Sequence, residues 1–123
     1  MDISNQSTTS STSLRNEAWL KRMTLLLNDN VCHPRLSVRW LAANLYLSER
    51  QFSRKTQQMT GLTPNKLIRE AKLQLAYQLL YNQEISSVKA AAHRLQFSDV
   101  KYFSRIFFRR FGYHPSTLIH RVK

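Results

Sequence analysis

Two stretches of the chain carry nearly the same phrase, FSRKTQQMTGLTP at residues 52–64 and FSRIFFRRFGYHP at residues 103–115. Both begin with Phe-Ser-Arg, both have Gly seven residues after that Arg, and both have Pro three residues after the Gly. Internal repetition is the signature of a repeated structural unit, so both copies are expected to adopt one local structure. The rest of the chain is organised around these two copies.

The repeat extends well beyond this phrase. Aligned in full, the first copy spans residues 37–68 and the second spans residues 87–119, with one extra residue after Ser98. Twelve aligned positions are identical, where chance would give about two. Two copies are fewer than the roughly three that a solenoid needs, so we expect a pair of similar units.

The first copy has the pattern of a helix, a tight turn and a second helix. Ser37 is a predicted N-cap for a helix over residues 38–45. Ser48 and Gln51 match a capping box at the start of the second helix, and Gly61 is placed to end that helix in a left-handed conformation. The expected inner side of the second helix consists of Phe52, Thr56 and Met59.

The second copy repeats this pattern. Ser86 or Ser87 is the expected start of its first helix, Ser98 is the predicted cap of its second helix, and Gly112 is placed to end that helix. The expected inner stripe of the second helix consists of Phe103, Phe107 and Phe111.

A long helix is predicted between the two copies, with Thr63 as its N-cap and Pro64 at its first position. Its 18 residues, 64–81, would span about 27 Å at the α-helical rise. The expected buried stripe consists of Leu67, Ala71, Leu75 and Leu79, with Ile68, Ala76 and Leu80 beside it.

The predicted fold is all-α, with about seven helices: two helix-turn-helix units joined by this long central helix. An amphipathic helix over residues 14–28 precedes the first unit, with Trp19 expected in the core, and a last helix begins at Pro115. The expected divisions are a disordered leader or linker at 1–13, the first unit at 14–62, the connecting helix at 63–82 and the second unit at 83–123.

The net charge of +12 is concentrated in the part of the chain that repeats. Residues 35–123 hold sixteen Lys and Arg against four acidic residues, whereas residues 1–34 are balanced. Such a balance favours a surface that binds a polyanion over a merely solvated face. The single cysteine, Cys32, excludes an internal disulfide framework and favours a reducing compartment, the cytoplasm.

The second helix of each unit presents a basic and polar outer side once its Phe residues face inward. Such a surface on a capped helix start can enter the DNA major groove, where Arg pairs with guanine and backbone N–H groups meet phosphates. The outward residues near the helix starts are Glu49, Arg50, Ser53, Arg54 and Gln57 in the first unit, and Val100, Lys101, Ser104, Arg105, Phe108 and Arg109 in the second. We expect these surfaces to bind double-stranded DNA.

Residues 36–119 resemble the DNA-binding domain of AraC/XylS-type transcription regulators, most specifically in the second unit's FSDVKYFSR and FFRRFGYHP. The resemblance implies a bacterial transcription regulator that binds DNA through both units. The positions that match the family's base-reading residues are Arg50, Ser53 and Arg54 in the first unit, and Val100, Lys101, Ser104 and Arg105 in the second; Arg109 joins them as a DNA-binding candidate.

The sequence of residues 48–76, which follows a Trp-containing first helix, is most similar to output domains at the C-terminus of hybrid two-component sensors. That similarity implies that the chain is part of a larger sensor, with the Ser/Thr-rich leader as its tether. RNA polymerase is a further candidate partner of a regulator of this kind.

Four positions depart from the family's pattern. Tyr46 and Gln96 stand where the family has a turn glycine, so either they adopt a left-handed conformation or the turn is built differently. Ala91 replaces a larger apolar residue, so the second unit's first helix is expected to pack thinly. An outward Phe108 could pack on a neighbouring helix, contact a thymine methyl group or dock a partner.

Other classes of function have less support. Two glycines cannot build a phosphate-cradling loop, and the histidines lack metal-ligand spacing, so we expect no enzyme activity, no metal site and no cofactor. The alternative function is a basic helical module that binds RNA or an anionic membrane surface. We expect no membrane contact, because the apolar stripes are needed for a core.

Overall fold

The structure, a computed structural model, describes residues 11–120. Over this range it is all-helical and confirms the predicted fold class. Its seven helices are α2 (Ser11–Asp29), α3 (Val38–Asn44), α4 (Glu49–Thr60), α5 (Pro64–Tyr81), α6 (Val88–Arg94), α7 (Val100–Phe111) and α8 (Pro115–His120).

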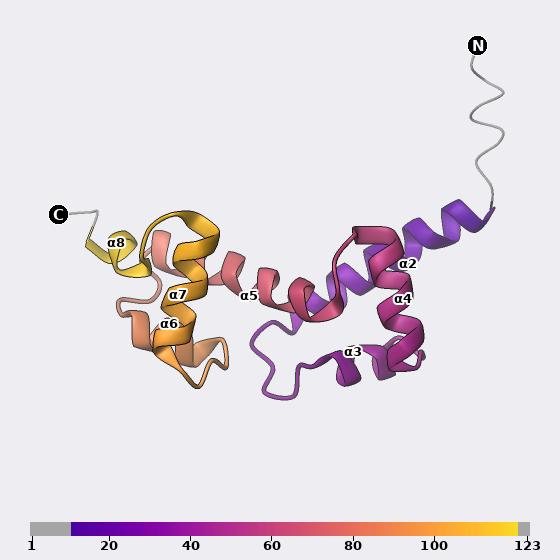
Figure 1. The fold of residues 1–123 in the computed structure, drawn as a ribbon, viewed down its shortest axis with the longest axis horizontal. Coiled ribbons are helices and arrows are strands. Elements are labelled where there is room, and N and C mark those ends of the chain that lie inside the picture. The colour runs from indigo at the N-terminus through magenta and orange to yellow at the C-terminus, as the bar shows by residue number, and fades with distance from the viewer. Residues whose placement is uncertain (1–10, 121–123) are drawn as a thin grey trace, which may run out of the picture.

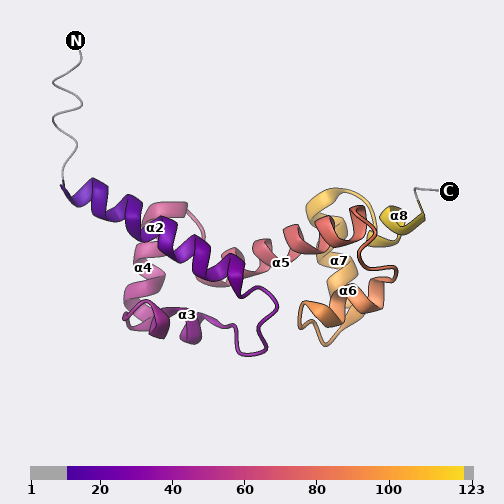
Figure 2. The same cartoon turned by 180° about the vertical axis from the view of Figure 1, so that it is seen from behind.

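The two helix-turn-helix units lie at opposite ends of α5 (Figure 1). Helices α3 and α4 form the first pair and α6 and α7 form the second, so each repeat copy corresponds to one pair. Helices α4 and α7 run in the same direction and lie on the side of the molecule that faces the viewer in Figure 1. Seen from behind in Figure 2, α2 is in front and both α4 and α7 lie at the back.

The first unit has its own hydrophobic core, which lies between α2, α3, α4 and the start of α5. Phe52 is fully buried there, and the ring of Trp19 packs edge-on against it with 6.2 Å between centroids. The prediction that Trp19 lies in the core is therefore confirmed. The buried members of this core are Trp19, Met23, Leu27, Leu41, Ala42, Leu45, Phe52 and Ile68.

The second core is larger and contains the predicted aromatic stripe. Phe103 and Phe107 are fully buried, and Phe111 packs at its edge. Ala91 is also fully buried, so the small residue at this position lies inside the core.

The buried face of α5 differs from the predicted stripe. Leu67, Ala71 and Leu75 are only partly buried, whereas Leu73, which was not predicted, is 3 % exposed. The reason is that α5 serves two cores in succession: Ile68 lies in the first, and Leu73, Ala76, Leu79 and Leu80 lie in the second. The predicted stripe would be buried only if one neighbouring element covered the same face of α5 along its whole length.

The loop after α2 joins the N-terminal part of the chain to the second unit. Val31 is buried in the second core although α2 packs in the first. The Gln96 side chain donates a hydrogen bond to the carbonyl of Cys32 at 3.4 Å. The two units are thus connected by this loop as well as by α5.

The N-terminal helix begins earlier than expected. Helix α2 starts at Ser11, inside the segment 1–13 that was predicted to be a disordered leader. Residues 1–10 of that leader, and residues 121–123 of the predicted second unit, lie outside the described residues.

Candidate nucleic-acid interface

Helix α4 is fixed in the first unit by the predicted caps. The Ser48 side chain accepts a hydrogen bond from the backbone N–H of Gln51, and the Gln51 side chain accepts one from the N–H of Ser48. Gly61 ends the helix in the left-handed conformation, with φ +76°. The capping box and the C-cap are therefore confirmed, and they fix where this helix begins and ends.

The inner side of α4 is set by Phe52 and Thr56, which are both fully buried. This orientation leaves the predicted contact residues on the outside: Arg50 and Arg54 are exposed and Ser53 is half-buried. All three belong to the first six residues of the helix.

Helix α7 is capped by Asp99, not by Ser98 as predicted. The Asp99 carboxylate accepts hydrogen bonds from the N–H groups of Lys101 and Tyr102, at 2.9 and 3.1 Å. The extra residue of the second copy lies at this point. The extra residue places the Asp99 carboxylate at the cap, where it accepts hydrogen bonds from two N–H groups. In the first copy the Ser48 hydroxyl accepts a hydrogen bond from one. Gly112 ends the helix as predicted, with φ +87°.

The outer side of α7 carries the remaining predicted contact residues. Phe103 and Phe107 are fully buried, and Ile106 beside them is 6 % exposed. On the opposite side, Val100 and Ser104 are half-buried, and Lys101, Arg105 and Arg109 are exposed. The guanidinium carbon of Arg105 lies 5.4 Å from the centre of the Tyr102 ring.

The cations of these two surfaces have no acidic partners. Within residues 11–120 the structure has one ion pair, between Arg110 and Glu70. Neither of these residues belongs to the predicted contact set. The basic side chains of the predicted contact set, Arg50, Arg54, Lys101, Arg105 and Arg109, are therefore not engaged in ion pairs within the described residues.

The turn of each unit contains a residue in the left-handed region. Tyr46 has φ 60° and Gln96 has φ 66°, which decides between the two alternatives for these turns. Each turn thus keeps the backbone conformation that glycine adopts most easily, without glycine. Gln83, after α5, has φ 63° and was not predicted to be left-handed.

The outward Phe108 packs within its own unit. Its ring stacks on that of His114, with 4.6 Å between centroids, and 46 % of the residue stays exposed. His114 lies in the loop between α7 and α8, so the ring contact of Phe108 is with a loop residue and not with a neighbouring helix, the first of the three alternatives.

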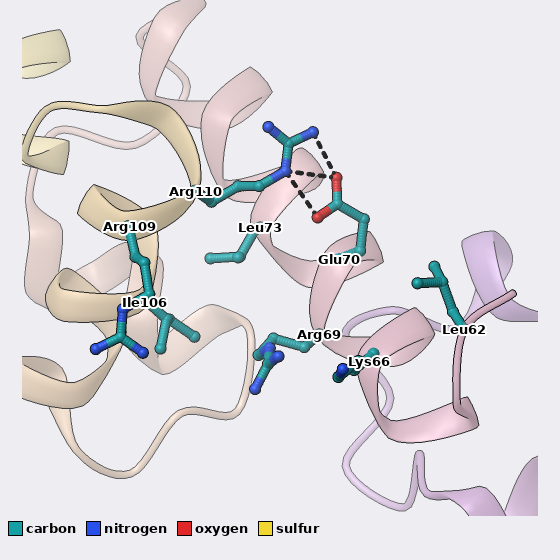
Figure 3. A pocket seen from close by; sticks show the side chains of 8 residues that line it. All are labelled: Leu62, Lys66, Arg69, Glu70, Leu73, Ile106, Arg109 and Arg110. Atoms are coloured by element: carbon teal, nitrogen blue, oxygen red, sulfur yellow. Dashed lines mark hydrogen bonds and ion pairs between the residues drawn. The ribbon is translucent and has the colours of Figure 1, made fainter.

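Two further basic residues, Lys66 and Arg69 on α5, were missed by the sequence analysis. They line a cleft of about 520 Å³ between α5 and α7, together with Arg109 and Arg110 (Figure 3). The available signal was their spacing of three on the polar side of a helix, which places both on one face. That signal does not say which helix lies opposite.

The described residues contain no helix long and apolar enough to cross a membrane. Within the same range, no three His, Cys, Asp or Glu side chains lie together as a metal site would require.

Comparison with known proteins agrees with this geometry. The family model described as a helix-turn-helix domain matches residues 41–121. The chain is 38% identical over 96 residues to the HTH-type transcriptional activator RhaS of Shigella boydii, which covers 76% of this chain and 34% of that protein. It is 30% identical over 100 residues to histidine kinase P4 of Formosa agariphila, covering 81% of this chain and 7% of the kinase.

A solved structure has the same fold. The AraC-type transcriptional regulator from Chromobacterium violaceum superposes with a TM-score of 0.76 at 28% identity, over 84% of this chain and 90% of that one. The fold and the exposed basic sides of α4 and α7 together define a DNA-binding domain with two helix-turn-helix units. The chain belongs to the AraC-type family of helix-turn-helix domains. It spans about a third of the length of the RhaS relatives it matches.

Proposed function

We propose that this domain binds one DNA duplex with both units at once, with α4 and α7 in successive segments of the major groove. Sequence-specific DNA binding and transcription regulation follow from membership of the family. The proposal adds the manner of binding and the residues that perform it.

One observation carries the proposal: the two recognition helices lie on the same side of the molecule and run in the same direction (Figure 1). Successive major-groove segments on one side of a duplex are one helical turn apart, about 34 Å. Two parallel helices held at the ends of α5, which is about 27 Å long by its 18 residues, suit that spacing. Bound in this way, the domain would present the exposed cations of α4 and α7 to base edges and phosphates.

The roles of the contact residues follow from their chemistry. Arg54 and Arg105 occupy equivalent positions of the repeat, and an arginine can pair with the O6 and N7 atoms of guanine through two hydrogen bonds. The same role is open to Arg50 and Lys101. Ser53 and Ser104 offer hydroxyl groups to bases or phosphates, Val100 offers a methyl surface to thymine, and Arg109 is placed for phosphate.

The domain's place in a larger protein is also a proposal. The match to a histidine kinase, of which the chain covers 7%, favours an output domain attached to a sensor. In such a protein, residues 11–62, 63–82 and 83–123 would be the first unit, the connecting helix and the second unit, and the residues before Ser11 would be the tether. The relatives named as activators favour activation, with RNA polymerase as a partner, in the bacterial cytoplasm.

The test is the selection of bound duplexes from a random library by the wild-type chain and by Arg54→Ala and Arg105→Ala. Each replacement should relax the selected sequence at a few adjacent base pairs and weaken binding there by about 1–3 kcal/mol. Lys21→Ala, on the exposed side of α2, is the matched control and should select the wild-type sequence.

Unchanged motifs with both arginine variants would show that these residues do not read bases. Binding to anionic liposomes or single-stranded RNA as tight as binding to duplex DNA would favour the alternative function instead. We expect the wild-type motif to lack two-fold symmetry, because the two recognition helices differ at Arg50 and Lys101.

A further inference from the structure

The cleft between α5 and α7 combines an apolar floor with a basic rim (Figure 3). Leu73 and Ile106, which are 3 % and 6 % exposed, form the floor. The rim has four basic side chains and one carboxylate, Glu70. Arg109 comes from the outer side of α7, so the cleft continues the recognition surface of the second unit onto the connecting helix.

The single carboxylate is engaged by a single arginine. Arg110 donates hydrogen bonds to both Glu70 oxygens, at 2.8 to 3.0 Å, and these bonds hold the pKa of Glu70 below its ordinary value of 4.5. Figure 3 shows this pair on one side of the cleft, and the side chains of Lys66, Arg69 and Arg109 on the other.

Three cations of the cleft are therefore left without an ion pair: Lys66, Arg69 and Arg109. Arg69 contributes to the low pKa of Glu70 through its charge, but it forms no ion pair with it. Three like charges on one rim add their positive potentials, so together they attract an anion that lies close to all three.

The position of the cleft indicates which anion this is. It lies between α5 and α7 (Figure 3), and α5 is the helix that joins the two recognition helices (Figure 1). If both helices enter successive major-groove segments, the duplex between those segments passes over this part of α5, and its nearest groups are the phosphates that border the minor groove.

We propose that this cleft binds the phosphodiester backbone of the DNA between the two half-sites, with Lys66 and Arg69 as phosphate ligands beside Arg109. The inference rests on the proposed function and extends it. It makes α5 a DNA-binding element as well as a connector. Phosphate contacts carry no sequence information, so these residues raise affinity for every sequence equally.

The test uses a duplex selected by the wild-type chain, with the variants Lys66→Gln and Arg69→Gln and the control Lys21→Gln. Each loss of a phosphate contact should make the plot of log affinity against log salt less steep by about 0.9. This corresponds to a roughly eightfold loss of affinity at 0.1 M salt. The selected motif should not change. The cap at Thr63 uses the backbone N–H of Lys66, so this side-chain replacement leaves it intact.

A second measurement locates the contact on the DNA. Neutral methylphosphonates in place of the phosphates between the half-sites should weaken wild-type binding several-fold more than the binding of the double variant, Lys66→Gln with Arg69→Gln, which keeps Arg109 alone. Equal losses for both proteins would place the contact elsewhere and overturn the inference.

The outcomes separate this inference from the proposed function. If Lys66→Gln and Arg69→Gln bind as tightly as Lys21→Gln while Arg54→Ala still changes the motif, the cleft does not bind DNA but the function stands. If the wild-type chain selects no motif, the proposed function itself fails. A motif altered by Lys66→Gln would show base reading, which contradicts a phosphate role.

Discussion

Tyr46 and Gln96 hold the turns of the two units in a conformation that costs energy for any residue except glycine. A left-handed residue with a Cβ atom is less stable than glycine in the same place by about 1 kcal/mol. Tyr46 is 92 % exposed, so packing of its ring does not offset this cost. Gln96 has a partial compensation in its hydrogen bond to the Cys32 carbonyl.

The strain at Tyr46 can be measured with two replacements that both remove the ring. Tyr46→Ala keeps the left-handed cost and Tyr46→Gly removes it, so the glycine variant should be more stable to urea by about 1 kcal/mol. Equal free energies of unfolding for the two variants would mean that the turn rearranges when the tyrosine is lost.

At the scale of single residues, most of the caps that begin and end the helices were predicted from the sequence. Ser37, Ser48, Thr63, Gly61 and Gly112 have the cap roles that their residue types and spacing suggested. The cap of α7 was assigned one residue too early, to Ser98, because the alignment with Ser48 took precedence over the local chemistry of Asp99. A sequence repeat predicts that the second copy also has an N-cap at this point, but an inserted residue can be the cap in place of the aligned one.

At the scale of the elements, the contact between α5 and α7 has a polar part that the sequence could not reveal. Glu70 and Arg110 are 40 residues apart, and their ion pair joins the connecting helix to the second recognition helix. No helical period links them, because the pairing depends on how two helices cross. For the same reason Leu73 was not assigned to the core.

The Glu70–Arg110 pair should make stability depend on pH in a defined direction. Because the pKa of Glu70 is lowered in the folded state, the pair contributes stability above pH 4.5, and this contribution is lost as the pH falls through the folded-state pKa. Glu70→Gln should therefore be less stable to urea than wild type at pH 7, and the difference should shrink as the pH falls below 4.5.

The matched control for this effect is Glu84→Gln, at an exposed position after α5. It should show no comparable dependence on pH. A Glu70→Gln deficit that does not shrink at any pH below 4.5 at which the chain stays folded would mean that packing, rather than the charge of Glu70, holds the two helices together.

At the scale of the whole molecule, two separate cores are held in one arrangement by α5 and by the loop after α2. Helix α5 supplies Ile68 to one core and four residues to the other, and Val31 reaches the second core from the N-terminal side. The repeat predicted two units and the connecting helix. It did not predict the Val31 contact, because a single apolar residue in a loop belongs to no periodic pattern.

The shared orientation of α4 and α7 is the feature on which the proposed function depends most. With two connections between the units, the separation of the recognition helices should be nearly fixed. A rigid arrangement tolerates only one spacing between the half-sites, whereas a flexible tether would tolerate several.

The most direct measurement of this claim is a titration of the chain against three duplexes: the selected site, and the same site with about five or about ten base pairs inserted between its halves. Five base pairs rotate one half-site to the far side of the duplex, and ten restore its side but move it one turn away. We predict a large loss of affinity for both insertions. Recovery at ten base pairs would contradict the fixed arrangement, and full affinity at five would show that only one unit reads DNA.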